Sequence, residues 1–284
     1  MKTKNKVERM FSTFKLIIIL LIVALIVGIA IFAFSGKINN NVNDDTVVEE
    51  EIEEESEFSF YNNLYNEYHT LNSDYVGYLE FKNNLLYNYE EYCEDEYPGL
   101  IVRSNIVDEG GSVNDANSEY LKNDITKGYS DIGQEFMDGS NLLDDNNLPI
   151  DQNIIIYGHF VYRDHNLKFG PLHKFEDANN YETYDTFTIT FNHERRAYLV
   201  TDAFFYNVDE YDDDRANSPF ATNYTKEELE NYMYRVKNEY DNTLDTGITI
   251  EYGDNFVTLQ TCVEDRDDLL YFVLGKEINR ETFE

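Results

Sequence analysis

Apolar and polar residues follow several distinct patterns along this chain, and each pattern predicts an element. Apolar side chains recur at helical spacing through residues 58–71, which predicts a helix that leads into a folded domain. Residues 76–81 alternate as in a strand, and residues 100–102 form a second short strand after the turn at residues 97–99. The apolar run at residues 153–157 is typical of a buried strand.

The second half of the chain shows hairpin signals and one helix. Residues 186–191 and 197–201 flank a polar tetrapeptide, which predicts a hairpin. Thr225 to Glu228 has the capping-box sequence that begins a helix. Three further apolar runs predict strands, and the first two are expected to form a hairpin about Gly253: residues 248–250, 256–259 and 271–274. We therefore expect a mixed, mainly β fold, a barrel or sandwich with a helical lead-in and one inserted helix.

The first 57 residues have a different organisation. Residues 16–34 carry no charge and are long enough to cross a hydrocarbon core of about 30 Å, whereas a secretory signal would be shorter. Residues 1–15 are basic, so the positive-inside rule places them in the cytoplasm. Residues 35–57 are polar and then acidic, as in a disordered stalk. We expect a single-pass membrane protein with an extracellular domain over residues 58–284.

Composition limits the classes of function. The formal net charge of −34 excludes a surface that binds nucleic acid by neutralising phosphates. Hydrophobic residues make up 42% of the chain, and with 24 Tyr and 19 Phe we expect aromatic side chains to supply much of the core. Two cysteines, Cys93 and Cys262, make no disulfide framework. Neither has metal-ligand spacing, and the acidic loops lack the spacing of a calcium loop, so no metal or cofactor is expected.

Candidate catalytic residues lie where two predicted strands end. Thr258–Cys262 reads TLQTC, so a strand leads to a thiol at the start of an acidic loop. Tyr157-Gly158-His159 ends another strand in the same way, and a nearby imidazole can activate a thiol. The alternative is that Cys262 is an ordinary buried thiol. The other histidines, His173 among them, read as surface side chains in helices, loops or turns.

These motifs resemble those of the sortases. TLQTC is similar to the family's TLxTC signature, and NIIIYGHF at residues 153–160 resembles the segment that holds its histidine. Four further segments resemble class B sortases in the family's order: residues 71–81, residues 117–137, the FGPL of residues 169–172, and the helix after Thr225. The resemblance covers residues 58–278. It implies a sortase-like β-barrel with the helix inserted before the cysteine hairpin, and it agrees with an N-terminal transmembrane helix.

The resemblance also implies an activity and its partners. A sortase is a membrane-anchored cysteine transpeptidase of Gram-positive cell walls. Its thiolate attacks the carbonyl of a Thr in the C-terminal sorting motif of a secreted protein, its histidine protonates the leaving amine, and an amine of the peptidoglycan precursor takes the acyl group. On this basis Cys262 is the expected nucleophile and His159 its acid–base partner.

The family's arginine has no match at its usual place. In sortases an arginine about eight to ten residues after the cysteine stabilises the developing oxyanion, and here residues 270–272 are Leu, Tyr and Phe. Arg266 is the nearest candidate, although a solvated loop charge paired with Asp265 or Asp267 explains it as well. More remote candidates are Arg195, Arg196 and Arg215. The sequence therefore leaves three functions open: a transpeptidase, a hydrolase with the same Cys–His pair, or a weakly active or inactive sortase-like peptide-binding protein.

Overall fold

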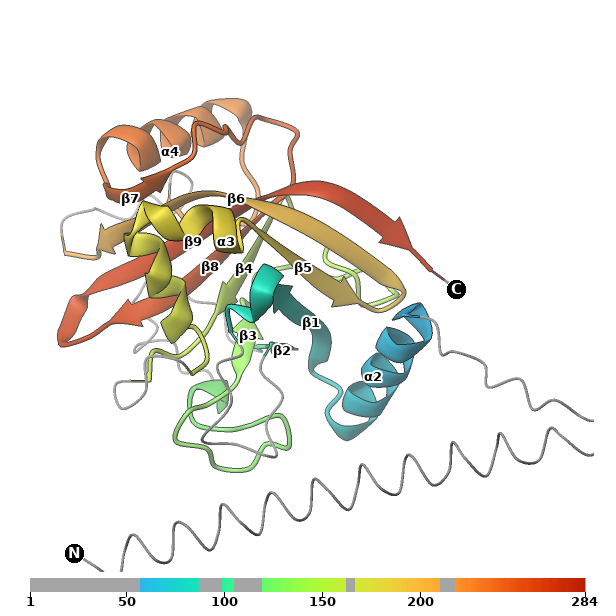
Figure 1. Cartoon of the computed structure of the whole chain (residues 1–284). Helices are drawn as coiled ribbons and strands as arrows, with labels where there is room; N and C mark the ends of the chain where they lie inside the picture. Colours follow the sequence, from blue (N-terminus) through green and yellow to red (C-terminus); the bar gives the residue numbers. More distant parts are fainter. Residues whose placement is uncertain (1–56, 87–98, 105–118, 162–166, 210–217, 284) are drawn as a thin grey trace, which may run out of the picture. The chain divides into compact units, whose positions relative to one another are not determined.

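The computed structural model describes residues 57–86, 99–104, 119–161, 167–209 and 218–283. Within these residues the chain forms one nine-stranded sheet with helices on its outside (Figure 1). The strands are β1 (Tyr75–Phe81), β2 (Leu100–Arg103), β3 (Glu135–Met137), β4 (Asn153–Tyr157), β5 (Thr186–Phe191), β6 (Glu194–Asn207), β7 (Asp241–Asp245), β8 (Phe256–Val263) and β9 (Arg266–Thr282). The α-helices are α2 (Glu57–Leu71), α3 (Tyr181–Tyr184) and α4 (Lys226–Asn238). Short 3-10 turns are η1 (Lys82–Asn84), η2 (Glu119–Leu121), η3 (Gly170–Glu176) and η4 (Ala178–Asn180).

The sheet closes into a barrel. Its strand order is β5-β1-β2-β3-β4-β8-β9-β6-β7, and a further pairing of β5 with β6 joins the two ends of the first eight strands. β7 is left outside the closure, paired with β6. Closure leaves few free strand edges, so the backbone groups of the eight strands are largely paired within the barrel. The mainly β architecture with a barrel, expected from the sequence, is confirmed.

Alternating side chains divide the strands into an inner and an outer face. Ile154 and Ile156 of β4 and Val257 and Leu259 of β8 belong to one large buried cluster, which also receives side chains from β1, β5, β6 and β9. Aromatic rings supply much of this interior, as the composition predicted; Phe187, for example, stacks on a ring of β6. The residues between these, such as Ile155, face outward into separate buried clusters beneath the loops and helices.

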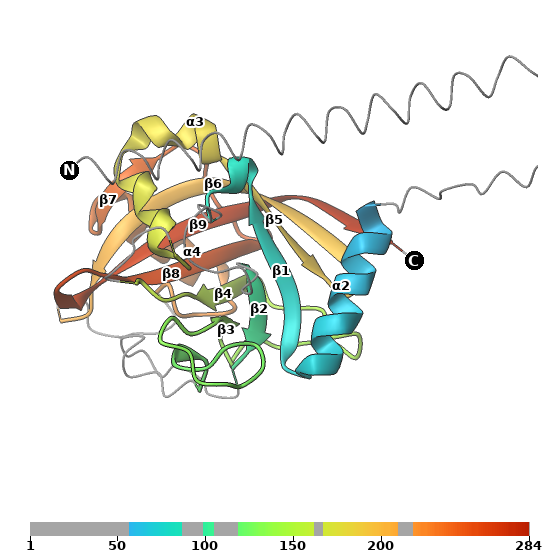
Figure 2. The same ribbon diagram turned by 60° about the horizontal axis from the view of Figure 1, so that its bottom comes forward.

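Both predicted helices are confirmed. α4 begins at a capping box in which the Thr225 hydroxyl accepts a hydrogen bond from the Glu228 amide and the Glu228 carboxylate accepts one from the Thr225 amide. Its buried face covers the outer side of β6 and β9. α2 lies beside β1 in both views of the ribbon (Figures 1 and 2). Its buried tyrosines pack against Tyr75, whose ring lies 5.6 Å from those of Tyr65 and Tyr68.

One predicted hairpin is wrong. Residues 248–250 do not form a strand, although Ile250 is buried beneath α4 and Gly253 turns the chain with a φ of +100°. The reason is that β8 already pairs with β4 on one side and with β9 on the other, so no edge is free for a hairpin partner. The strand predicted at residues 271–274 is part of the much longer β9, which pairs with both β8 and β6.

The predicted membrane anchor at residues 16–34 and the acidic stalk lie outside the described residues. Among the helices that the structure does describe, none combines the length and the apolarity that crossing a membrane requires.

Candidate functional site

Parallel pairing joins β4 and β8, the two strands that lead to the candidate catalytic residues. The register runs without interruption from Asn153 opposite Phe256 to Tyr157 opposite Gln260, a constant offset of 103 positions. Pairing continues for one more residue, because the Gly158 amide donates to the Gln260 carbonyl at 3.0 Å. His159 and Cys262 each follow the last paired residues, Tyr157 and Gln260, by two positions. Cys262 also packs in one buried cluster with Tyr157 and Phe160, which lie on either side of His159 in the sequence.

Cys262 lies on the outer face of the barrel. It follows the alternation of β8, in which Val257 and Leu259 point inward, and it packs with Tyr157 and Phe160 in a small outer cluster. Only 5% of Cys262 is exposed. His159 is half-buried, and its Nδ1 has no hydrogen-bond partner among the described residues. Cys262 is therefore almost fully enclosed by apolar side chains, while His159 keeps part of its surface exposed.

Both reactive groups are held in their neutral forms. Burial, and secondly the negative charge of Asp267, raise the pKa of the Cys262 thiol to about 11. Burial, and secondly the positive charges of Lys168 and Lys122, lower the pKa of His159. A thiol with a high pKa beside an imidazole with a low pKa is a neutral pair near pH 7, and the nucleophilic thiolate is its minor form.

A buried ion pair lies next to the histidine. Lys168 and Glu135 are both buried, and the Lys168 Nζ is 3.3 Å from the Glu135 carboxylate. Gln134 donates a second hydrogen bond to the same carboxylate oxygen at 2.9 Å. Lys168 forms an isolated bridge with Phe160, the residue after His159. The ion pair with Glu135 of β3 fixes the position of the Lys168 charge, which lowers the pKa of His159.

Arg266 is exposed and paired with a carboxylate of its own strand. It is the first residue of β9, its side chain is 51% exposed, and its Nε and one terminal nitrogen each donate to the Asp268 carboxylate at 2.8 Å. The pair expected with Asp265 or Asp267 is made with Asp268 instead. On the face that carries Cys262, β9 presents Leu270 opposite Cys262 and Phe272 opposite Gln260. Phe272 is packed in the aromatic cluster beneath α4, so no cation occupies that position.

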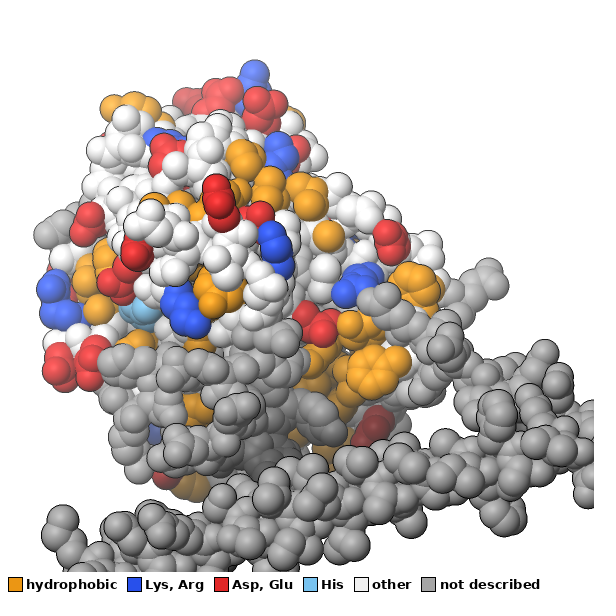
Figure 3. Space-filling model, viewed as in Figure 1, with side chains coloured by type: hydrophobic (Ala, Val, Ile, Leu, Met, Phe, Trp, Pro, Cys, Tyr) orange, Lys and Arg blue, Asp and Glu red, His pale blue; other side chains and the backbone are white. Residues whose placement is uncertain are grey.

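The remoter arginines are engaged elsewhere. The Arg195 guanidinium lies 5.0 Å from the centre of the Tyr61 ring on α2. Arg196 is buried and donates to Glu194 and to the Pro149 carbonyl. Arg215 and Cys93 lie outside the described residues. Residues 264–267 of the β8–β9 turn are exposed, and acidic side chains gather over this turn at the left of the space-filling view (Figure 3). An exposed, negatively charged turn thus follows Cys262.

Two residues that the sequence did not single out also belong to this site. His173, expected on the surface, is only 17% exposed, and its Nε2 lies 2.9 Å from the Cys262 carbonyl. His173 directly follows the apolar residues 169–172, and because such a segment packs inward, this position could have indicated that His173 is buried. Gln260 is fully buried on the face of Cys262, and neither polar atom of its amide has a partner among the described residues. No sequence pattern distinguishes such a glutamine.

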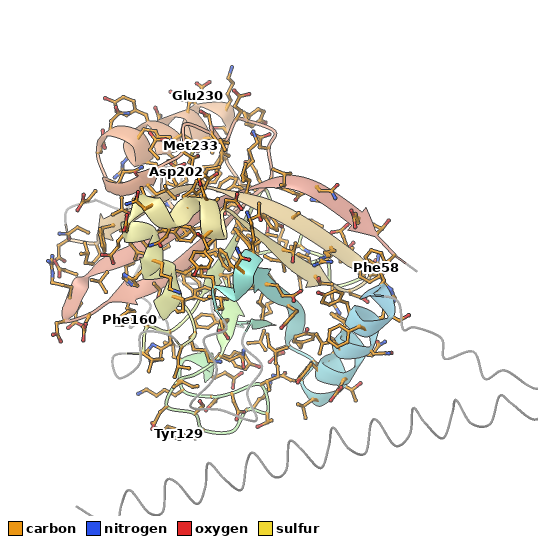
Figure 4. All side chains as sticks on the ribbon, in the orientation of Figure 1. Phe58, Tyr129, Phe160, Asp202, Glu230 and Met233 are labelled. Carbon is orange, nitrogen blue, oxygen red and sulfur yellow. The ribbon has the colours of Figure 1, made fainter. Side chains whose placement is uncertain are left out.

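A groove of about 570 Å³ lies apart from these residues, beneath α4. Met233 and Glu230 of the helix form one wall (Figure 4), and Tyr252 belongs to the other. The lining includes neither Cys262 nor His159. In the same view Phe160, the residue after His159, lies on the side of the barrel where β8 turns into β9. The groove and the reactive pair are therefore separate features.

Comparison with known proteins identifies the fold. No family model matches the chain. No curated protein matches it either. Solved structures do: a Staphylococcus aureus sortase B–substrate complex (18% identity, 77% of this chain and 86% of that chain, TM-score 0.57) and the sortase B of Clostridium perfringens (21% identity, 75% and 99%, TM-score 0.56). A Bacillus anthracis protein described as similar to sortase B aligns with a TM-score of 0.55 at 19% identity, over 78% of this chain and 83% of that chain. The chain has a sortase B-like fold.

Proposed function

We propose that this chain is a sortase-type cysteine transpeptidase in which Cys262 is the nucleophile and His159 the acid–base partner. The observation that supports this most directly is the β4–β8 register, which ends at Tyr157 opposite Gln260, two residues before His159 and Cys262 respectively. The fold supports the same class of reaction, since a solved sortase B with this fold is described as a substrate complex and another as a complex with triglycine.

The proposed reaction proceeds in two acyl transfers. Proton transfer from Cys262 to His159 creates the thiolate, which attacks the carbonyl carbon of a Thr residue in the sorting motif. His159 then donates its proton to the nitrogen of the leaving peptide as the C–N bond breaks, and a thioester remains on Cys262. An amine of the cell-wall precursor attacks the thioester, loses a proton to His159, and expels the thiolate.

The developing oxyanion needs a hydrogen-bond donor, and we assign this role to Arg266. Arg266 is the arginine nearest to Cys262 in the sequence, and its side chain is exposed. To reach the carbonyl of a bound peptide it must leave the Asp268 carboxylate. Exposed ion pairs contribute only about 0–1 kcal/mol, so this exchange costs little.

Product analysis tests the proposal. A purified domain beginning near residue 58 is incubated with peptides that contain a Thr–X bond, with and without triglycine as the amine, and the products are identified by mass spectrometry. We expect a thioester on Cys262 and a peptide joined to triglycine. Cys262→Ala should abolish both products, while Cys93→Ala should leave them unchanged. Hydrolysed peptide alone, even at high triglycine, would show a hydrolase, and an unmodified Cys262 would refute the covalent mechanism.

We also propose that residues 16–34 anchor the protein in the cell membrane, with the catalytic domain outside. The uncharged run and its basic N-terminal flank support this topology. The partners would be a secreted protein with a C-terminal sorting motif and the peptidoglycan precursor. Protease added to intact cells should digest the domain after residue 36, and protection until lysis would contradict this orientation.

A further inference from the structure

His173 bridges the two strand ends that carry the reactive pair. Its Nε2 lies 2.9 Å from the Cys262 carbonyl oxygen at the end of β8. Its ring meets the ring of Phe160, the residue after His159, edge-on with centroids 4.9 Å apart. On the other side the same ring stacks on Tyr271 of β9 at 4.7 Å. One imidazole therefore contacts the residue after His159, the nucleophile's own backbone and the strand next to it.

The Cys262 carbonyl needs such a partner because the ladder is irregular at this point. β4 ends at Tyr157, so β8 loses its parallel neighbour two residues before Cys262. On the other side the β8–β9 register shifts between Cys262 and Val263, as in a β-bulge. A buried carbonyl without a hydrogen bond is costly, and the strand end that carries it is free to move. The imidazole provides the missing donor.

Glu176 fixes the orientation of that donor. A carbonyl oxygen only accepts, so Nε2 of His173 must carry the proton in this contact. Nδ1 lies 2.5 Å from a Glu176 carboxylate oxygen, three residues further along η3. The carboxylate therefore holds the ring from the Nδ1 side while Nε2 faces the Cys262 carbonyl.

We propose that His173, oriented by Glu176, is a positioning residue that holds the Cys262 end of β8 in register with the segment carrying His159. This inference deepens the proposed function and rests on it for its kinetic consequence. Losing the contact frees the Cys262 carbonyl and lets the thiol drift from the imidazole. Acyl transfer then slows, while the thiol, now 5% exposed, becomes more accessible to small reagents.

Three substitutions separate the functions of the ring. His173→Gln places an amide NH near the position of Nε2 and retains the donor to Cys262. His173→Asn can reach only the Nδ1 position, toward Glu176. His173→Phe retains the stacking on Tyr271 but removes both hydrogen bonds. The matched control is His69→Phe, because His69 also contacts a carbonyl, that of Tyr75 at 3.1 Å, and also stacks on a tyrosine, but it lies in α2.

The experiment has two readouts for each variant in a Cys93→Ala background. The first is kcat and KM for acyl transfer to triglycine, and the second is the rate of Cys262 alkylation by iodoacetamide. For His173→Phe and His173→Asn we expect kcat to fall by about tenfold, the usual size of one lost hydrogen bond, with KM nearly unchanged. Alkylation should become several-fold faster. His173→Gln should restore most of kcat, and His69→Phe should resemble the parent protein.

The two readouts distinguish failure of this inference from failure of the proposed function. If the parent protein transfers no acyl group, the proposed function fails, but faster alkylation in His173→Phe and His173→Asn alone would still support positioning. Unchanged alkylation and kcat in these two variants would overturn the inference. So would a His173→Gln variant as impaired as His173→Phe, or equal losses in His69→Phe, because either result means that the ring serves only general packing.

Discussion

The ionisation of Cys262 offers the sharpest quantitative test of the site. Its pKa of about 11, against an ordinary thiol value of 9.0, corresponds to about 2.7 kcal/mol in favour of the neutral thiol. At pH 7 only about one molecule in ten thousand then carries the free thiolate. The pKa of His159 lies below its ordinary value of 6.5, so the thiolate–imidazolium pair makes up less than about 10⁻⁴ of the enzyme. Forming this ion pair from the neutral thiol and imidazole therefore costs about 6 kcal/mol.

The assay is the pH dependence of Cys262 alkylation by iodoacetamide in the Cys93→Ala variant, without substrate. The rate should rise about tenfold per pH unit from pH 7 to 10, because the thiolate is the reactive form and its fraction is far from saturation. Asp267→Asn removes the second cause of the raised pKa of Cys262. The curve of alkylation rate against pH for this variant should move to lower pH, but by less than the difference between about 11 and 9.0. Burial, the first cause, remains in that variant.

A plateau in the alkylation rate below pH 9 would refute this reasoning. It would mean that a cation faces the thiol in solution, against the arrangement in which Arg266 pairs with Asp268. The control is Asp254→Asn, an exposed-loop carboxylate that pairs with Lys276 and is not among the groups that shift the thiol. Its alkylation curve should coincide with that of the parent protein.

The same pKa shifts determine how folding stability changes with pH. Cys262 resists ionisation in the folded state, so its contribution to stability is lost as pH rises above about 9, where the unfolded thiol ionises. His159 resists protonation when folded, so stability is lost as pH falls below about 6.5. For acyl transfer we expect a bell-shaped profile of kcat/KM with its acidic limb below pH 6.5 and its alkaline limb near pH 11.

Four further substitutions test other parts of the site. Arg266→Ala should lower kcat/KM by about a hundredfold without changing Tm. Asp268→Asn removes the carboxylate that pairs with Arg266 and should raise kcat/KM. If kcat/KM of both variants equals that of the parent protein, Arg266 takes no part in the reaction. Gly158→Ala should lower the free energy of unfolding by about 1–3 kcal/mol and reduce activity, because the new Cβ would lie 2.3 Å from the buried ring of Phe169. An unchanged midpoint of denaturant unfolding would contradict this expected loss of stability. Gln260→Leu should raise the free energy of unfolding by about 1–2 kcal/mol, since it removes a buried amide without a partner among the described residues. A stability loss in that variant would show that the amide is bonded in solution.

The position of Phe272 sets the present site apart from the pattern that its sequence resembles. Residues 270–272 stand where the resemblance implies an arginine, and of these β9 buries Phe272 among aromatic side chains of β6 and of the loop before α4, including Phe204 at 5.4 Å and Phe220 at 5.7 Å. A guanidinium placed there would enter an apolar cluster. In the proposed reaction a donor for the oxyanion must therefore come from another position, which is why Arg266 and its release from Asp268 matter for the proposed activity.

Local patterns were sufficient to predict most elements. The alternation and apolar runs predicted β1, β4 and β5 nearly to the residue, and the capping box located the start of α4, because these signals depend on neighbours only a few positions away. The resemblance of TLQTC and NIIIYGHF to sortase motifs named Cys262 and His159 before any geometry was known. The strand ends in these motifs also indicated where the two side chains would lie.

Only the tertiary structure decided how these pieces meet. Three features depend on which strand edges are already occupied, and that is a property of the whole sheet: the parallel register of β4 with β8, the closure of β5 onto β6 and the absence of a hairpin at residues 248–250. The same holds for His173: its sequence context is a short turn, and its contact with the Cys262 carbonyl exists because folding brings together positions 89 residues apart. Sequence patterns thus determined the elements and the reactive residue types, while long-range pairing and packing determined their neighbours and their protonation.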